Sequence, residues 1–186
     1  NKVKICKDNQ DIIKNSSVIF LSVTPNVGKK ILGSLKFEKN KNIISLISTI
    51  KLKKLKKLTN SSRICKAIPL PFIENCFGPI IVSPKNKVAK KIFSKLGQVI
   101  EIRSEKIAFS FWSTSSIMAA YYELFNQTSD WLMKKGLKQN IANSYTSDLF
   151  SALSKDAQIK KNEGFKKLVK DSQTPNGLNM QVLKEL

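Results

Sequence analysis

Small polar residues and prolines follow three apolar runs of the sequence. Ser22-Val23-Thr24-Pro25 closes the first run, Ser48-Thr49 follows the second, and Ala67-Ile68-Pro69 ends the third. If the runs are strands of an open parallel sheet, their carboxyl ends form the edge where ligands bind in such sheets. The three ends together favour a site for a flat cofactor ring, whereas turn formation by proline explains any single end equally well.

Two further clusters could hold a carboxylate. Ser113-Thr114-Ser115-Ser116 precedes a long helical pattern, and Thr174-Pro175-Asn176-Gly177-Leu178-Asn179 is a turn that leads into the last one. Hydroxyl groups and unpaired backbone N–H groups at the start of a helix bind anions. For the serine-rich cluster, a simple helix-capping role is an equally good interpretation.

Several kinds of chemistry are excluded by residue counts. The 186 residues contain no histidine, which rules out Ser-His-Asp and Cys-His nucleophiles and histidine-ligated metal sites. The three cysteines have no C-x-x-C spacing, which favours a reducing compartment over a disulfide framework or zinc site. The polar start and the lack of an apolar run of about 18 residues predict a cytoplasmic protein without a membrane span.

The net charge of +20 is a weak guide to partners. Only Arg63 and Arg103 are arginines among the 33 basic residues, whereas nucleic-acid surfaces usually recruit arginine for bidentate contacts. Asn and Ile are abundant together with Lys, as in proteins encoded by AT-rich genes. We therefore attribute the charge to the composition of the coding sequence, and nucleic-acid binding is the less favoured alternative.

Within residues 51–58, leucine recurs at every third position. This pattern predicts a surface helix with a lysine-coated outer face rather than a membrane-binding segment.

The predicted secondary structure differs between the two halves of the chain. The first half predicts strands over residues 18–23, 42–47, 63–68, 78–82 and 98–102, with helices over 27–35, 52–58 and 88–96. From about residue 104, only helices are predicted, over 107–135, 137–153, 164–170 and 178–186. We therefore expect a partial Rossmann-like α/β domain over residues 1–103, followed by an all-α domain over residues 104–186.

The colinear order of short motifs resembles the pyrroline-5-carboxylate reductase family over nearly the whole chain. These motifs are strand-Val-x-Pro, Ile-Ser-Leu-Ile, Leu-x-x-Leu, Arg-strand-Pro-x-Pro, Gly-Pro-Ile-Ile-Val, Phe-Ser-x-Leu-Gly-x-Val and Thr-Pro-x-Gly. The resemblance implies reduction of pyrroline-5-carboxylate or a related cyclic imino acid with NADP or NAD. It also implies a homodimer formed by intertwined helices of the second domain, with an active site shared between subunits.

The same resemblance assigns roles to the polar positions, although it names no catalytic side chain and no metal ligand. Thr24 and Pro25 would line the nicotinamide, with Ala67, Ile68 and Pro69 beside them. The substrate carboxylate and ring would lie near two groups of residues, Ser113, Thr114 and Ser115 in the first and Thr174, Asn176, Gly177 and Asn179 in the second.

The chain departs from the family pattern in three of the predicted pocket segments. It has Ala67-Ile68-Pro69-Leu70-Pro71 for Met-Pro-Asn-Thr-Pro, Ser113-Thr114-Ser115-Ser116-Ile117 for Ser-Gly-Ser-Gly-Pro, and Pro175-Asn176-Gly177-Leu178-Asn179 for Pro-Gly-Gly-Thr-Thr. A non-catalytic dimeric relative is therefore an alternative to an enzyme.

The phosphate-binding fingerprint of dinucleotide folds is the other departure. None of the seven glycines belongs to a G-x-G-x-x-G motif, and the first predicted strand resembles the family's fourth. We expect a fragment that lacks its first βαβ unit, because the strand over residues 18–23 would otherwise expose an unpaired edge. Loss of dinucleotide binding is the alternative explanation.

Overall fold

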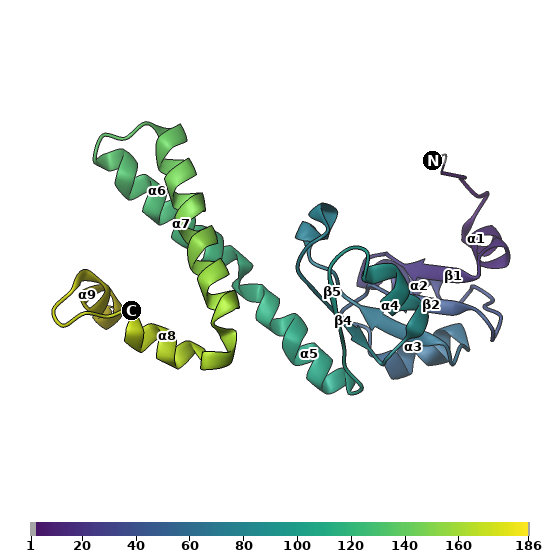
Figure 1. The fold of residues 1–186 in the computed structure, drawn as a ribbon. Coiled ribbons are helices and arrows are strands. Elements are labelled where there is room, and N and C mark those ends of the chain that lie inside the picture. Colours follow the sequence, from purple (N-terminus) through teal and green to yellow (C-terminus); the bar gives the residue numbers. More distant parts are fainter. Residues whose placement is uncertain (1–2, 186) are drawn as a thin grey trace. The chain divides into compact units, whose positions relative to one another are not determined.

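The computed structural model describes residues 3–185, which divide into two compact units, one ending at residue 116 and the other beginning at residue 117. The first is an α/β unit and the second is wholly helical, which confirms the predicted fold class (Figure 1). The first unit extends beyond the predicted boundary at residue 103. It does so because helix α5 (Glu105–Thr114) packs Ala108 and Trp112 against Ile81 of the sheet.

A five-stranded sheet forms the centre of the first unit, in the order β1-β2-β3-β4-β5. The strands are β1 (Val18–Leu21), β2 (Asn42–Ser45), β3 (Ile64–Ala67), β4 (Pro79–Ser83) and β5 (Gln98–Glu101). All five strands were predicted, and the three whose ends were expected to share one edge, β1, β2 and β3, are parallel, whereas β3 and β4 are antiparallel. Residues 68–78 connect these two strands and are too few for the crossover that a parallel pair requires.

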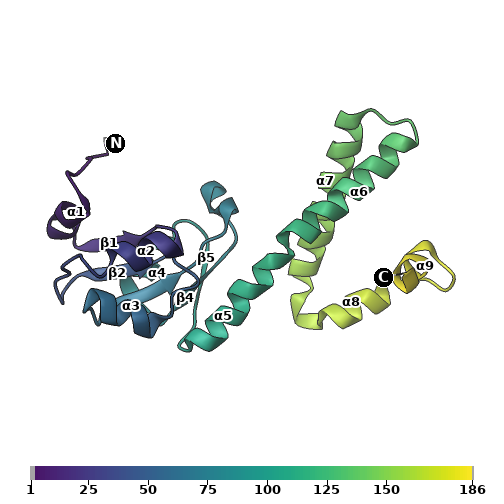
Figure 2. The ribbon, with the colours of Figure 1, turned by 180° about the vertical axis from the view of Figure 1, so that it is seen from behind.

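Helices cover both faces of the sheet (Figures 1 and 2). Helices α1 (Asn9–Asn15), α2 (Pro25–Ile31) and α3 (Leu52–Thr59) contribute to one apolar core, which includes Ile43 and Leu55. Helix α4 (Lys87–Phe93) closes a second core, on the opposite face, through Ala89 and Phe93. The alternation of side chains along each strand sends successive residues to opposite cores. Helix α1 was not predicted, although Asp8 caps it by accepting a hydrogen bond of 2.8 Å from the backbone N–H of Asp11.

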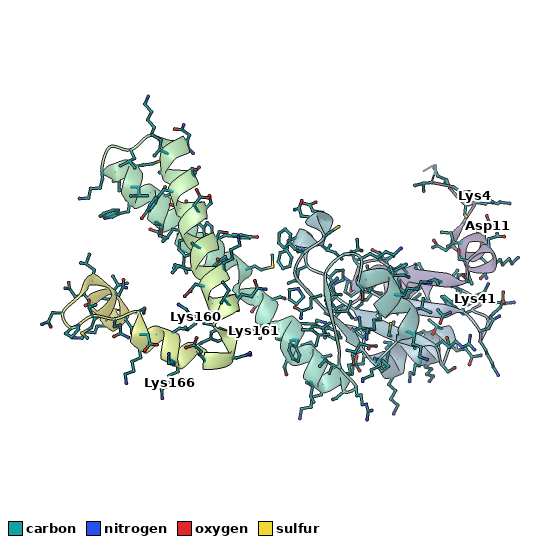
Figure 3. The ribbon with its side chains drawn as sticks, viewed as in Figure 1. Lys4, Asp11, Lys41, Lys160, Lys161 and Lys166 are labelled. Atoms are coloured by element: carbon teal, nitrogen blue, oxygen red, sulfur yellow. The ribbon has the colours of Figure 1, made fainter. Side chains whose placement is uncertain are left out.

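Most lysine side chains among the described residues are exposed to solvent, including Lys4, Lys160, Lys161 and Lys166, which Figure 3 labels. In α3, Leu55 is buried and the lysines are exposed, which confirms the prediction of a lysine-coated surface helix. Lys41 is an exception because its ammonium group donates to the backbone carbonyl of Lys14 at 3.2 Å and pairs with Glu38 at 3.5 Å. None of the described helices is long and apolar enough to cross a membrane.

The second unit begins with two helices, α6 (Met118–Lys134) and α7 (Gln139–Ile159), that pack against each other. Their contact contains the stacked rings of Phe125 and Phe150, with centroids 4.3 Å apart, and a hydrogen bond of 3.1 Å between Tyr121 and Ser154. The short helix η3 (Lys161–Glu163) leads to α8 (Phe165–Asp171) and α9 (Leu178–Glu185). The predicted end of the last helix at residue 186 lies outside the described residues.

The single helix predicted over residues 107–135 is wrong, because a 3₁₀ turn, η2 (Ser115–Ile117), separates α5 from α6. The serine-rich segment supplies the physical reason. Its hydroxyl groups donate to backbone carbonyls three or four residues earlier, and such bonds compete with regular helical geometry.

Gly97 allows two loops of the first unit to approach closely. A Cβ atom there would lie 2.5 Å from the backbone carbonyl oxygen of Gly78, which also accepts a hydrogen bond from the N–H of Gln98. We therefore expect Gly97→Ala to lower the free energy of unfolding by about 1–3 kcal/mol, measured by urea denaturation. The matched control is Gly33→Ala, because the nearest atom to its added Cβ lies 4.0 Å away. Equal stabilities of the two variants would contradict this account.

Cys65 lies inside the sheet and is expected to resist alkylation. Burial, and secondarily the Glu101 carboxylate, raises the pKa of its thiol from 9.0 to about 12. Iodoacetamide at pH 8 should therefore modify the exposed Cys76 readily and Cys65 only after unfolding. The contribution of the protonated thiol to stability is complete below pH 9 and is lost as the pH rises towards 12. Labelling of Cys65 at the rate of Cys76 in the folded protein would show that the thiol is not buried.

Candidate functional site

The carboxyl ends of three strands meet at one edge of the sheet. β1, β2 and β3 are mutually parallel, with Leu21 opposite Ser45 and Ser45 opposite Lys66. The segments that follow these strands contain Thr24-Pro25, Ser48-Thr49 and Ile68-Pro69, and they therefore leave the sheet at the same edge. This is the position at which open α/β sheets bind ligands.

Thr24 and Pro25 form the start of α2. Thr24 is the N-cap residue with extended backbone angles, and Pro25 occupies the first turn, where its missing N–H is not needed. The Thr24 side chain is exposed and makes no capping hydrogen bond, so its hydroxyl group is available to a ligand. The next turn of the helix packs closely, because a Cβ atom on Gly28 would lie 3.0 Å from Ile47 in the segment after β2.

The end of β3 is less accessible than the sequence predicted. The Ala67 side chain is fully buried in the core beside Ile80 and Val82, so only its backbone can face a ligand at this edge. Ile68 packs against the cluster of Ile81, Ala108 and Trp112, and it is half-buried. Pro69 is also half-buried, and the 3₁₀ helix η1 (Pro71–Asn75) follows it.

A buried ion pair that was not predicted lies beside this edge. The Lys66 ammonium group donates to the backbone carbonyl of Ser48 at 2.7 Å and to the Glu105 carboxylate at 3.1 Å. Its nitrogen also lies 4.9 Å from the centre of the Trp112 ring. The sequence contained one signal for this pair, which is a lysine in the middle of an otherwise apolar strand. A residue that is 2% exposed carries a charge only where a partner compensates it.

Glu105 connects the ion pair to a second helix. Its Oε1 atom accepts a hydrogen bond of 2.9 Å from the backbone N–H of Leu52, at the start of α3, as well as the bond from Lys66. The carboxylate thus joins the first turns of α3 and α5, and it lies where the positive end of each helix dipole favours negative charge.

A cavity of about 660 Å³ opens beside the ion pair. Its walls combine one apolar ring, two hydroxyl groups and four charged side chains. The lining residues are Ser48, Thr49, Lys51, Lys66, Glu105, Lys106 and Phe109. Among the described residues there is no group of three Cys, Asp or Glu side chains that could hold a metal ion.

The prediction that Ser113, Thr114, Ser115 and Ser116 open a helix was wrong. Ser113 and Thr114 end α5, Ser115 and Ser116 form the 3₁₀ turn, and α6 begins only at Met118. Each hydroxyl group donates to a carbonyl of the preceding turn, for example Ser113 to Phe109 at 2.9 Å. The segment therefore does not present the N-terminal N–H groups that would hold a carboxylate.

The second predicted cluster does form a turn before a helix. Asn176 has a left-handed backbone with φ of 60°, and the Gly177 N–H donates to the Thr174 carbonyl at 2.9 Å. The Asn179 side-chain amide donates to the Ser172 carbonyl at 2.8 Å, so one of its donors is already used within the chain. Thr174 and Asn176 are exposed. This turn belongs to the second unit, whereas Ser113, Thr114 and Ser115 belong to the first.

Comparison with protein-family models and with curated proteins finds no match. Solved structures do match. A 1-pyrroline-5-carboxylate reductase from Streptococcus pyogenes is 18% identical with a TM-score of 0.82, covering 97% of this chain and 71% of that one. A pyrroline carboxylate reductase from Plasmodium falciparum with NADP bound is 21% identical with a TM-score of 0.83, covering 97% and 72%.

A reductive aminase from Aspergillus terreus in complex with NADPH and ethyl levulinate is a more distant match. It is 13% identical with a TM-score of 0.61, and the alignment covers 94% of this chain and 66% of that one. At these identities the likeness establishes the fold, a Rossmann-like α/β unit followed by a helical unit.

Proposed function

We propose that the protein is an NAD(P)H-dependent oxidoreductase that reduces a cyclic imine, pyrroline-5-carboxylate or a related imino acid, to the amine. The observation that carries the proposal is the structural match over 97% of the chain to a pyrroline carboxylate reductase with NADP bound. The predicted cofactor residues support it, because Thr24, Pro25 and Pro69 follow parallel strands at the ligand-binding edge of the sheet.

The residues at this edge fit the nicotinamide end of a dinucleotide. Thr24 has a hydroxyl group that caps no backbone N–H, and Pro25 and Pro69 provide rigid apolar surface. The backbone of Ala67 and Ile68 leads directly into Pro69. These residues would hold the ring by contact and by hydrogen bonds. The printed sequence contains no G-x-G-x-x-G segment for the pyrophosphate, so the fit concerns the nicotinamide end alone.

A nicotinamide bound at this edge would supply a hydride for the carbon of the C=N bond. The contribution of the chain is to orient the two rings and to keep water away from them. A cyclic iminium is already electrophilic and needs little acid catalysis. The turn containing Thr174, Asn176, Gly177 and Asn179 remains our proposal for contact with the substrate.

We also propose a homodimer formed through the helical unit. Helix α7 buries Ala142 and Thr146, and its Phe150 ring stacks on Phe125 of α6. A separate apolar stripe with a spacing of four residues, Ile141, Tyr145, Leu149 and Leu153, is exposed. An exposed stripe of this length on a packed helix is typical of a protein interface. The cytoplasmic location expected from the sequence stays a prediction.

The proposal is tested by measuring NADH and NADPH oxidation by the purified natural chain with 1-pyrroline-5-carboxylate, 1-pyrroline-2-carboxylate and 2-methyl-1-pyrroline. We expect turnover with at least one imine, and loss of that turnover in Thr24→Trp, whose indole would occupy the nicotinamide surface. Lys39→Trp, on an exposed loop, is the matched control. A chain that binds neither cofactor in a fluorescence titration would instead be the non-catalytic relative.

A further inference from the structure

We propose that a second cavity of the first unit, at the amino ends of β2 and β3, binds the phosphate group of a small phosphorylated molecule. The cavity has a volume of about 320 Å³, and its lining residues are Lys39, Lys56, Asn60, Ser61 and Ser62. These residues precede β2 or β3 in the sequence, whereas the candidate functional site follows the same strands at the opposite edge of the sheet. The proposal goes beyond the proposed reduction, because it concerns a separate site and binding alone.

Hydrogen bonds within the chain hold the two loops that form this cavity. The buried Ser61 hydroxyl group donates to the Lys41 carbonyl at 3.2 Å and accepts a bond of 3.1 Å from the backbone N–H of Arg63. The Arg63 guanidinium group donates to the Asn40 carbonyl at 3.3 Å. These bonds join the loop before β2 to the loop before β3. The cavity is therefore formed before a ligand arrives, which lowers the entropic cost of binding.

The cavity walls contain two positive charges and no carboxylate. Lys39 and Lys56 are exposed, and neither ammonium group forms an ion pair within the part of the chain that the structure describes. Glu38 is the only acidic residue in residues 12–73, and it already pairs with Lys41 at 3.5 Å. The end of α3 adds a negative charge of only about half a unit, which the two lysines exceed. The cavity therefore attracts anions.

The types of the lining side chains define the class of ligand. A phosphate monoester presents up to two negative charges and three terminal oxygen atoms, which match two ammonium groups. The Asn60 amide and the Ser62 hydroxyl group can bond to hydroxyl groups of the ligand, because neither side chain forms a hydrogen bond with another described residue. The lining includes no aromatic ring on which a nucleobase would stack. A sugar phosphate therefore fits better than a nucleotide.

The test follows the backbone amide resonances of Asn60 and Ser62 by NMR at about 0.1 M salt, where the screening length is about 10 Å. The probe is ribose 5-phosphate, and the uncharged control is ribose. We expect saturable shifts with ribose 5-phosphate and an affinity at least about tenfold lower for ribose. Inorganic phosphate should shift the same resonances, because the phosphate group supplies the charged contacts. Equal affinities for ribose and ribose 5-phosphate would overturn the proposal.

Variants separate the cavity from the general positive charge of the protein. We expect Lys39→Gln/Lys56→Gln to weaken binding of ribose 5-phosphate about tenfold. The matched control is Lys29→Gln/Lys30→Gln, which removes the same charge from exposed positions of α2 and should bind as the parent does. All four side chains are exposed, so both variants keep the packed core. An equal loss of affinity in the two variants would overturn the proposal.

A short oligothymidylate distinguishes this site from a nonspecific surface for polyanions. Its phosphodiesters carry one charge each, and the cavity accommodates a single phosphate group with its sugar. We expect Lys39→Gln/Lys56→Gln to lose affinity for ribose 5-phosphate by a larger factor than for the oligothymidylate. If the oligothymidylate binds more tightly than ribose 5-phosphate and both double variants weaken it equally, the lysines act as a diffuse charged surface and the proposal is wrong.

Discussion

Replacing Glu105 by Gln is expected to lower the free energy of unfolding of the first unit by about 2–4 kcal/mol. The side chain of Glu105 is only 29% exposed and that of Lys66 is 2% exposed, so the variant would leave an ammonium charge inside the protein without its carboxylate. The Gln oxygen can still accept the hydrogen bond from the N–H of Leu52. The loss therefore reports the charge pair rather than the start of α3.

Urea unfolding followed by Trp112 fluorescence, in a Trp131→Phe background, measures this effect in the first unit. The double variant Lys66→Met/Glu105→Gln should recover at least half of the loss, because it removes both charges and keeps an apolar chain in the strand. Asp156→Asn breaks the solvent-exposed pair with Lys160 and should leave stability unchanged. If Glu105→Gln is as stable as Asp156→Asn, the Lys66–Glu105 pair does not stabilise the fold.

Replacing Leu149 by Glu is expected to convert the proposed dimer to monomers, with an increase of about 100-fold or more in the dissociation constant. Leu149 lies in the exposed stripe of α7 with Ile141, Tyr145 and Leu153, and a carboxylate there would be buried in an apolar interface without a partner. Sedimentation of the protein over a range of concentrations measures the change.

Ser151→Glu is the control for this prediction, because Ser151 is exposed on α7 outside the apolar stripe. It adds the same charge to the same helix and should leave the dimer intact. A parent protein that is monomeric at all concentrations, or equal dissociation of the two variants, would show that this stripe is not the interface.

The strands and sheet-covering helices could be predicted because their pattern is local. Each strand is a short run of β-branched and apolar residues, and α3 repeats leucine at one spacing throughout. The antiparallel direction of β4 could not be predicted from such a local pattern. It depends on whether the connection formed by residues 68–78 is long enough to cross the sheet, which is a property of three-dimensional geometry.

The candidate site was predicted in part. The strand-end residues Thr24, Pro25 and Pro69 were identifiable because carboxyl ends of parallel strands converge by topology. The ion pair of Lys66 and Glu105 was missed because the two residues are 39 positions apart and neither belongs to a motif. The place of Ser113 at the start of a helix was wrongly predicted because a hydroxyl group can either cap the next helix or bond to the preceding turn, and the sequence does not distinguish these choices.

Hydride transfer is the measurement that tests the central claim most directly. NADPH carrying deuterium at the transferable position of its nicotinamide ring would be incubated with the natural chain and the cyclic imine that is turned over fastest. The account predicts a cyclic amine with one deuterium on the former C=N carbon, and no such product with Thr24→Trp. Bound NADPH that transfers no deuterium to any of the three imines, under conditions where a pyrroline-5-carboxylate reductase does so, would contradict it.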